Sequence, residues 1–247
     1  MECQSLPKNE ASEPSLSSSR FSQRCVSLAV SFAETVGLRA GELAFAPEFS
    51  NTSASMSLCG RASETITRNR GSAHPVVPLA TVSDDVLLWV GYKEFWEKYG
   101  NLQNFRFVEG GFTLHVGRPG ELEKPQILRS EWVGRRSRAF VDEAGHPHWQ
   151  LDALESIRSS PSKAKARFGD FASSSPVQEF SSEMQSTDGA DLLFSLTIEK
   201  MHLASAAHWW GSPEVSVAHV PKTVTELNRW VIGCVAYMRQ EAMRCRI

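Results

Sequence analysis

Several features that mark large protein classes are missing from this sequence of 247 residues. It contains no phosphate-binding P-loop, no dinucleotide-binding glycine fingerprint, no internal repeat and no heptad array. These absences count against the common nucleotide-binding enzymes, repeat proteins and coiled coils. No apolar run approaches the roughly 18 residues that suggest a membrane span, so the sequence predicts no membrane attachment.

The chain also lacks a strong charge of one sign and any cysteine pairing pattern. A formal net charge of −2 provides no general attraction for nucleic acid, which is therefore not an expected partner. The five cysteines are scattered without a C-x-x-C pair, which predicts reduced thiols in a cytoplasmic protein. Acidic residues precede the apolar stretch that begins at Cys25, so a secretory signal is not expected.

Composition indicates a globular protein, because 41% of the residues are hydrophobic and 22% are charged. Residues 1–79 predict a poorly patterned, partly disordered N-terminal region. Within it, residues 21–37 have helical spacing and residues 43–46 are the best strand candidate. Residues 80–247 predict a single domain that contains a long polar loop at 154–190.

The pattern of elements after residue 80 predicts an α+β fold. Aromatic residues at helical intervals after Ser83-Asp84-Asp85 predict a helix over 84–99. Strand-like runs follow at 105–108, 112–116, 126–133, 138–142 and 146–152, and another at 191–199. Thr223 and Glu226 form a capping-box pattern before an apolar stripe, which predicts an amphipathic helix over 223–245. We therefore expect an antiparallel sheet of about five strands backed by these two helices.

The segment from Gly145 to Asp152 gathers the most groups able to do chemistry. With a strand's period of two, its polar residues His146, His148, Gln150 and Asp152 share one face, and Trp149 belongs to the other. One interpretation is a divalent metal site, such as zinc, with His146 and His148 as ligands and Asp152 as a tentative third. Other candidates for the third ligand are Glu131, His115, His202, His208 and His219. The alternative interpretation is that these polar side chains have no functional role and form hydrogen bonds on the surface of the sheet.

The run His146-Pro147-His148-Trp149-Gln150 resembles the His-Pro-His-x-Gln signature of the galactose-1-phosphate uridylyltransferase branch of the histidine-triad superfamily. The resemblance implies that His148 attacks a nucleotide phosphorus, with His146 and Gln150 at the flanking signature positions. It covers these five residues alone. The surrounding sequence lacks the asparagine-rich approach and the cysteine pair of metal-binding members.

Arginines and tryptophans supply further candidate binding residues. Arg129 and Glu131 share a strand face by parity, so an arginine–carboxylate network near Arg138 is expected. Such arginines could clamp an anionic ligand or simply keep an exposed strand soluble. The adjacent Trp209 and Trp210 could form a recognition surface or pack in the core.

These observations leave two functional hypotheses. The first is a cytoplasmic, non-catalytic binding or assembly protein that binds a protein partner or itself through Trp209, Trp210, Arg138 and Gln150. The second is a histidine-dependent hydrolase or nucleotidyl transferase, possibly metal-assisted. In this enzyme, the catalytic residues would be His148, His146, Glu131 and Arg129.

Overall fold

The computed structural model describes residues 13–66, 74–100, 103–122, 124, 126–135, 137, 147–151 and 220–244. This part of the chain forms nine strands and two helices. The strands are β1 (Ser15–Ser17), β2 (Ala44–Phe49), β3 (Ser53–Cys59), β4 (Glu64–Ile66), β5 (His74–Thr81), β6 (Leu87–Tyr99), β7 (Asn104–Gly117), β8 (Gln126–Val133) and β9 (His148–Leu151). The helices are α1 (Ser18–Val36) and α6 (Val224–Arg244).

The strands form one antiparallel sheet built around the long strands β6 and β7. Its main path runs β2-β3-β6-β7-β8-β9. Strand β5 pairs with the first part of β6, and β3 pairs with the second part. Strand β1 pairs with the start of β7, and β4 pairs with β5. The expected antiparallel sheet and the α+β class are confirmed, but the sheet has more than about five strands.

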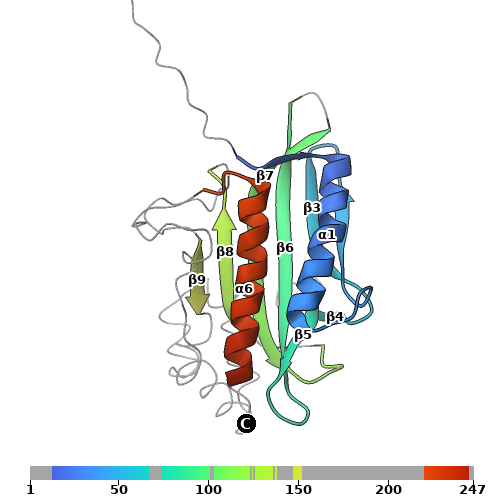
Figure 1. Ribbon diagram of the computed structural model, residues 1–247, viewed down its shortest axis with the longest axis vertical. Helices are drawn as coiled ribbons and strands as arrows, with labels where there is room; N and C mark the ends of the chain where they lie inside the picture. The colour runs from blue at the N-terminus through green and yellow to red at the C-terminus, as the bar shows by residue number, and fades with distance from the viewer. Residues whose placement is uncertain are drawn as a thin grey trace, which may run out of the picture.

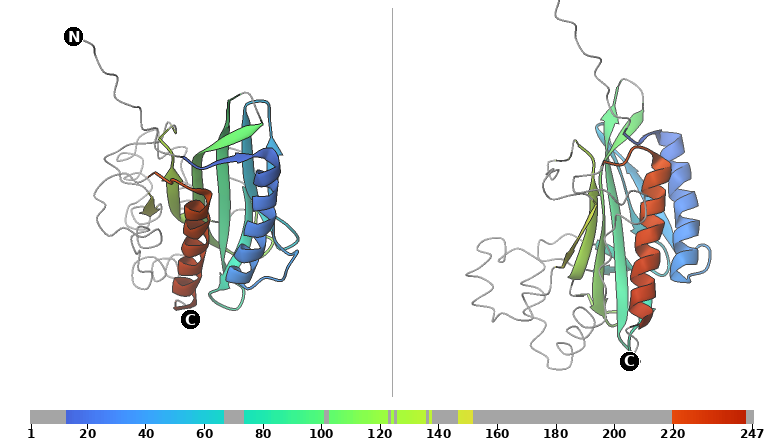
Figure 2. Two further views of the ribbon diagram at one scale, coloured as in Figure 1. Left: turned by 45° about the horizontal axis from the view of Figure 1, so that its top comes forward. Right: turned by 60° about the vertical axis from the view of Figure 1, so that its left-hand side comes forward.

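Both helices cover the same face of the sheet (Figures 1 and 2). Arg24 on α1 donates to Asn228 on α6, and Arg239 on α6 donates to the backbone oxygen of Thr35 at the end of α1. The two helices therefore run side by side in the same direction. We call the side that they cover the helix face and the opposite side the second face.

The C-terminal helix confirms the sequence prediction closely. The backbone N–H of Glu226 donates to Thr223 Oγ1 at 3.1 Å, and Glu226 accepts from the backbone of Lys222 at 2.8 Å. The predicted apolar stripe is buried against the sheet, with Trp230 packed edge-on against Phe112 and Trp132. Burial of a large apolar side chain contributes about 1.5–3 kcal/mol, so this stripe holds α6 in place.

Residues 15–66 form a helix and four strands, although they lie within the region 1–79 that was expected to be poorly patterned. Helix α1 matches the helical spacing seen at 21–37, and β2 includes most of the strand candidate at 43–46. Gly37 ends α1 with a positive φ of 76°, and Leu38 then donates back to the Ala33 carbonyl. Phe32 on α1 and Phe45 on β2 join the same core as α6.

The predicted helix over 84–99 is wrong, because this segment is strand β6. Ser83 and Val86 exchange backbone hydrogen bonds in the hairpin turn between β5 and β6. Leu88, Val90, Tyr92, Glu94 and Trp96 alternate toward the helix face and are all buried. Glu94 occupies one of these positions and interrupts the alternation of apolar and polar residues that is typical of a strand. The aromatic residues of this segment also recur at intervals typical of a helix.

Strand β7 is continuous through Gly110 and Gly111, which lie between the strand-like runs predicted at 105–108 and 112–116. The register shifts at Val108, which lies between Phe107 opposite Trp96 and Glu109 opposite Phe95. The irregularity is therefore a bulge, placed just before the two glycines. In the described ranges, no helix is long and apolar enough to cross a membrane.

Candidate functional site

The second face of the sheet brings several of the predicted site residues together. The register aligns two rows of residues across β6, β7, β8 and β9. The first row is Gly91, Thr113, Arg129 and Gln150. The second row is Lys93, Gly111, Glu131 and His148. Directly opposed residues of antiparallel strands share a face, so all positions of the two rows belong to the same face of the sheet.

Arg129 and Glu131 form the arginine–carboxylate pair that parity suggested. Arg129 Nη1 lies 3.3 Å from Glu131 Oε1, and each side chain is 31% exposed. Strand β9 pairs antiparallel with β8, which places His148 opposite Glu131 and Gln150 opposite Arg129. Trp149 packs against the core and against Tyr237 of α6. Positions 148 and 150 therefore belong to the second face.

His74, to which no sequence pattern pointed, enters this surface from the start of β5. Its Nε2 lies 2.9 Å from Thr113 Oγ1, and its ring lies 5.9 Å from that of His115. His115 is buried, and its Nδ1 lies 2.9 Å from the Lys124 carbonyl oxygen. Because a carbonyl only accepts, this nitrogen is the protonated one.

Gly91 makes the position of His74 sterically feasible. A Cβ atom built on Gly91 would lie 2.2 Å from His74 Nε2 and 2.7 Å from Thr113 Oγ1. The imidazole therefore occupies the space that a side chain at 91 would need. The signal available in the sequence was a glycine within an apolar strand, but the sequence does not reveal which side chain fills its place.

Two exposed aromatic residues extend the second face toward the end of β6. Phe95 is 38% exposed and Tyr99 is 45% exposed. The Arg106 guanidinium lies over the Tyr99 ring at 3.7 Å and pairs with Glu13 at 3.4 Å. This stacking holds Tyr99 in place, because cation–π contact favours one ring orientation.

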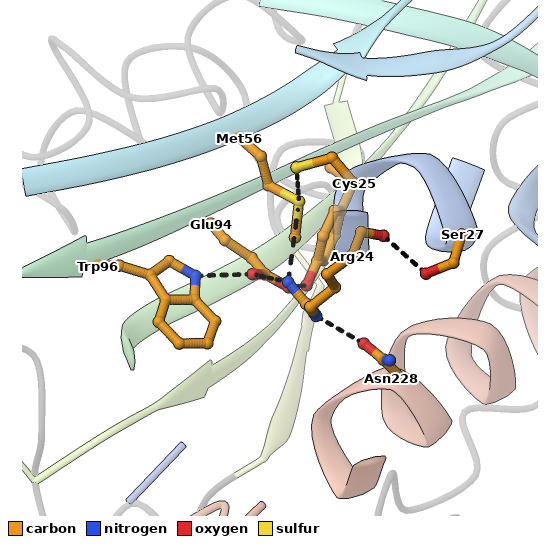
Figure 3. Close-up of polar contacts among 8 residues, drawn as sticks. Arg24, Cys25, Ser27, Met56, Glu94, Trp96 and Asn228 are labelled. Carbon is orange, nitrogen blue, oxygen red and sulfur yellow. Dashed lines mark hydrogen bonds and ion pairs between the residues drawn. The ribbon is translucent and has the colours of Figure 1, made fainter. Parts of the chain in front are cut away.

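The most elaborate polar cluster lies inside the core, between α1, β6 and α6 (Figure 3). Arg24 donates to both carboxylate oxygens of Glu94, at 2.6 and 2.7 Å, and to Asn228 at 2.7 Å. Glu94 also accepts from Trp96 Nε1 at 2.8 Å and from the Tyr92 hydroxyl. Its carboxylate is fully buried and tied by four donors, so the cluster anchors both helices to the sheet.

Burial shapes the acid–base behaviour of this cluster. Burial alone would lower the pKa of Arg24, but the charge and hydrogen bonds of Glu94 raise it above the usual value. Burial, reinforced by Glu94, raises the pKa of Tyr92 well above 10. Burial also raises the pKa of the Cys25 thiol to about 12. These three groups therefore keep their protons at neutral pH, which indicates a structural role in the core and not a role in proton transfer.

The remaining predicted site residues lie outside the described part of the chain. They are His146, Asp152, Arg138, Trp209 and Trp210, together with the alternative metal ligands His202, His208 and His219. The same holds for the strand at 138–142, the polar loop at 154–190 and the strand at 191–199. Among the residues that are described, no three His, Cys, Asp or Glu side chains are grouped to hold a metal ion. The metal interpretation of His146, His148 and Asp152 stays a prediction.

Comparisons with known proteins provide no relative for this chain. The five-residue resemblance around His148 does not extend to a match with a family model. The chain matches no protein-family model, no curated protein and no solved structure.

Proposed function

We propose that the protein is a cytoplasmic, non-catalytic binding protein whose second face binds a protein partner or another copy of this chain. The carrying observation is the exposure of Phe95 and Tyr99 among charged residues on the sheet side that neither α1 nor α6 covers. Binding energy in protein interfaces is concentrated in such aromatic residues, surrounded by a polar rim.

The arrangement around these two rings has the chemistry of a recognition surface. Phe95 lies between the exposed Lys93 and the half-buried Glu97 along β6, with the exposed Glu109 opposite on β7. Arg106 fixes Tyr99 before any partner binds. A ring that is already ordered loses less conformational entropy on binding, which favours affinity.

Strand β2, which is an edge strand among the described residues, is a poorer binding site than the second face. It carries the exposed Pro47 and Glu48 near its end. Proline offers no backbone N–H, and both proline and charge on an edge strand hinder the addition of another strand. We therefore assign binding to the face and its side chains.

A pair of photo-crosslinking variants tests this proposal. A benzophenone amino acid replaces Phe95 on the second face in one full-length variant and Val30 in the other. Val30 is a matched control because it is 47% exposed but lies on the outer side of α1. We expect discrete adducts, with a partner in lysate or with a second copy in purified protein, from position 95 and none from position 30.

Equal adduct patterns at both positions would contradict the assignment to the second face. A purified protein that stays monomeric and gives no adduct from position 95 in lysate would contradict the binding function itself.

The second candidate is a histidine-dependent hydrolase or nucleotidyl transferase at 146–150, and the register of β9 favours it. In the register of β8 and β9, His148 is the partner of Glu131 and Gln150 is the partner of Arg129, so position 148 lies opposite one member of the Arg129–Glu131 ion pair. Such a reaction needs a general base, a carboxylate that orients the base and a positively charged group that binds the anionic part of the substrate. Measuring metal content and phosphodiester hydrolysis for the parent and for His146→Ala/His148→Ala tests it. Activity lost in a folded double variant would support it, and an inactive parent would contradict it.

A further inference from the structure

One part of the second face is complementary to itself. We propose that the patch formed by Lys93, Phe95 and Glu109 binds the same patch of a second copy of this chain. This inference rests on the proposed binding role of the second face and selects one of the two occupants given there. It is based on two opposite charges that flank an exposed aromatic ring.

Phe95 is the apolar centre of this patch. Its side chain is 38% exposed. Ser55 lies directly opposite on β3, and Glu109 lies directly opposite on β7. In the next row, Lys93 lies opposite Gly111, which has no side chain. The ring is therefore the largest apolar group that this patch exposes, and its neighbours are small or charged.

Lys93 and Glu109 carry opposite charges that their own chain does not pair. Both residues are exposed, and neither forms an ion pair within the described part of the chain. Glu109 accepts a hydrogen bond on Oε2 from the Ser137 hydroxyl at 2.8 Å, which leaves Oε1 for another donor. Glu97, the other acidic neighbour of Phe95, is half-buried and already interacts within its own chain. Lys93 and Glu109 are therefore the charges that a second copy can pair.

Seen from Phe95, the two charges lie in perpendicular directions. Lys93 is two residues away along β6, which is about 7 Å, and Glu109 is on the neighbouring strand, about 5 Å away across the sheet. A two-fold axis that lies between two copies and bisects this right angle exchanges the two directions and returns Phe95 to itself. It brings Lys93 of each copy to Glu109 of the other, so the attractive contact forms twice.

The resulting arrangement is one that β-sheets adopt. The strands of the two copies cross at about 90°, which is the orthogonal class of sheet packing. Packed sheets lie about 10 Å apart, and the flexible lysine side chain can cross this gap to meet a glutamate from the other side. The two Phe95 rings meet at the centre, where aromatic pairs favour offset or edge-on contact. The contact therefore has an apolar centre and a charged rim.

Exchanging the two charges tests this arrangement. Lys93→Glu sets two acidic groups against each other at both contacts, and Glu109→Lys sets two basic groups against each other. When the two variants are mixed, both contacts again join opposite charges. Sedimentation velocity of the full-length protein over a concentration series measures self-association. Each variant alone should associate about tenfold or more weakly than the parent, and the equimolar mixture should recover the affinity of the parent.

Lys98→Glu is the matched control. It makes the same change of charge at another exposed position of β6, but position 98 alternates to the opposite side of the strand. It should leave self-association unchanged. Thermal unfolding followed by circular dichroism shows whether each variant is folded.

A parent that stays monomeric overturns the inference, as does a mixture that associates no more tightly than its separate components. The same holds if Lys98→Glu weakens association as much as Lys93→Glu. Adducts from position 95 to another protein in lysate, together with a monomeric parent, would refute self-association but leave the binding function standing. A monomeric parent without any adduct in lysate would remove both.

Discussion

The buried pair Arg24–Glu94 allows the energetic role of the core cluster to be measured against an internal control. Removing the guanidinium by Arg24→Ala leaves the Glu94 carboxylate fully buried, with the Tyr92 hydroxyl and the Trp96 N–H as its remaining donors. An uncompensated buried charge of this kind costs about 3–5 kcal/mol. Because domains are stable by about 5–15 kcal/mol, the variant should lose a large share of its free energy of unfolding.

Arg118 provides the control, because its Nε lies 2.6 Å from Asp85, the same separation as in the buried pair. Its side chain is 56% exposed, whereas that of Arg24 is 3% exposed. Screening by water leaves an exposed ion pair with little net effect on stability, so Arg118→Ala should barely change the free energy of unfolding. The two pairs match in charge and in separation, and they differ in burial and in the additional hydrogen bonds of Arg24 to the second Glu94 oxygen and to Asn228.

Urea unfolding followed by tryptophan fluorescence measures both variants, with the midpoint and the slope recorded separately. A double variant, Arg24→Met/Glu94→Leu, replaces both members of the buried pair with apolar side chains. It removes both charges, so it should be more stable than Arg24→Ala even though Tyr92 and Trp96 lose their acceptor. Equal losses for Arg24→Ala and Arg118→Ala, or a double variant no more stable than Arg24→Ala, would refute the reasoning.

Three further results are expected. Cys25 and Cys234 should resist iodoacetamide at pH 8 in the folded protein, because burial raises both thiol pKa values; mass spectrometry of their peptides measures this, and labelling as fast as in urea would contradict it. Stability should fall as pH rises above about 9, because the unfolded chain releases protons that folded Cys25 and Tyr92 retain; urea midpoints that stay constant from pH 8 to 11 would argue against this. Thr223→Ala should cost about 0.5–2 kcal/mol by removing the cap of α6, and an unchanged melting temperature would exclude that role.

Local signals explain which elements could be predicted from the sequence. Helix α6 carries its own capping box and a continuous apolar stripe, so no distant contact is needed to recognise it. Strand β6 was misread because Glu94 occupies a core position, which depends on Arg24, 70 residues earlier in the chain. Because the partner that neutralises Glu94 lies far away in the sequence, the burial of this charge cannot be predicted from the periodicity of the strand.

The same distinction applies to the candidate site. Parity along one strand was enough to pair Arg129 with Glu131. The approach of His74 to Thr113 spans 39 residues and depends on the pairing of β5, β6 and β7 and on the missing side chain at Gly91. Register between strands that are far apart in sequence is set by the whole sheet, so this contact could not be inferred beforehand.

The position of α6 in the chain affects the order in which the protein can fold as it is synthesised. Helix α1 precedes the strands that it covers, but α6 emerges from the ribosome after all of them. Until then, Phe112 and Trp132 lack the Trp230 ring that packs on them, and an apolar part of the helix face stays open. Nascent chains that expose such surface are prone to aggregate. The nascent chain should therefore depend on chaperones more than the complete protein does, until α6 covers its part of the helix face.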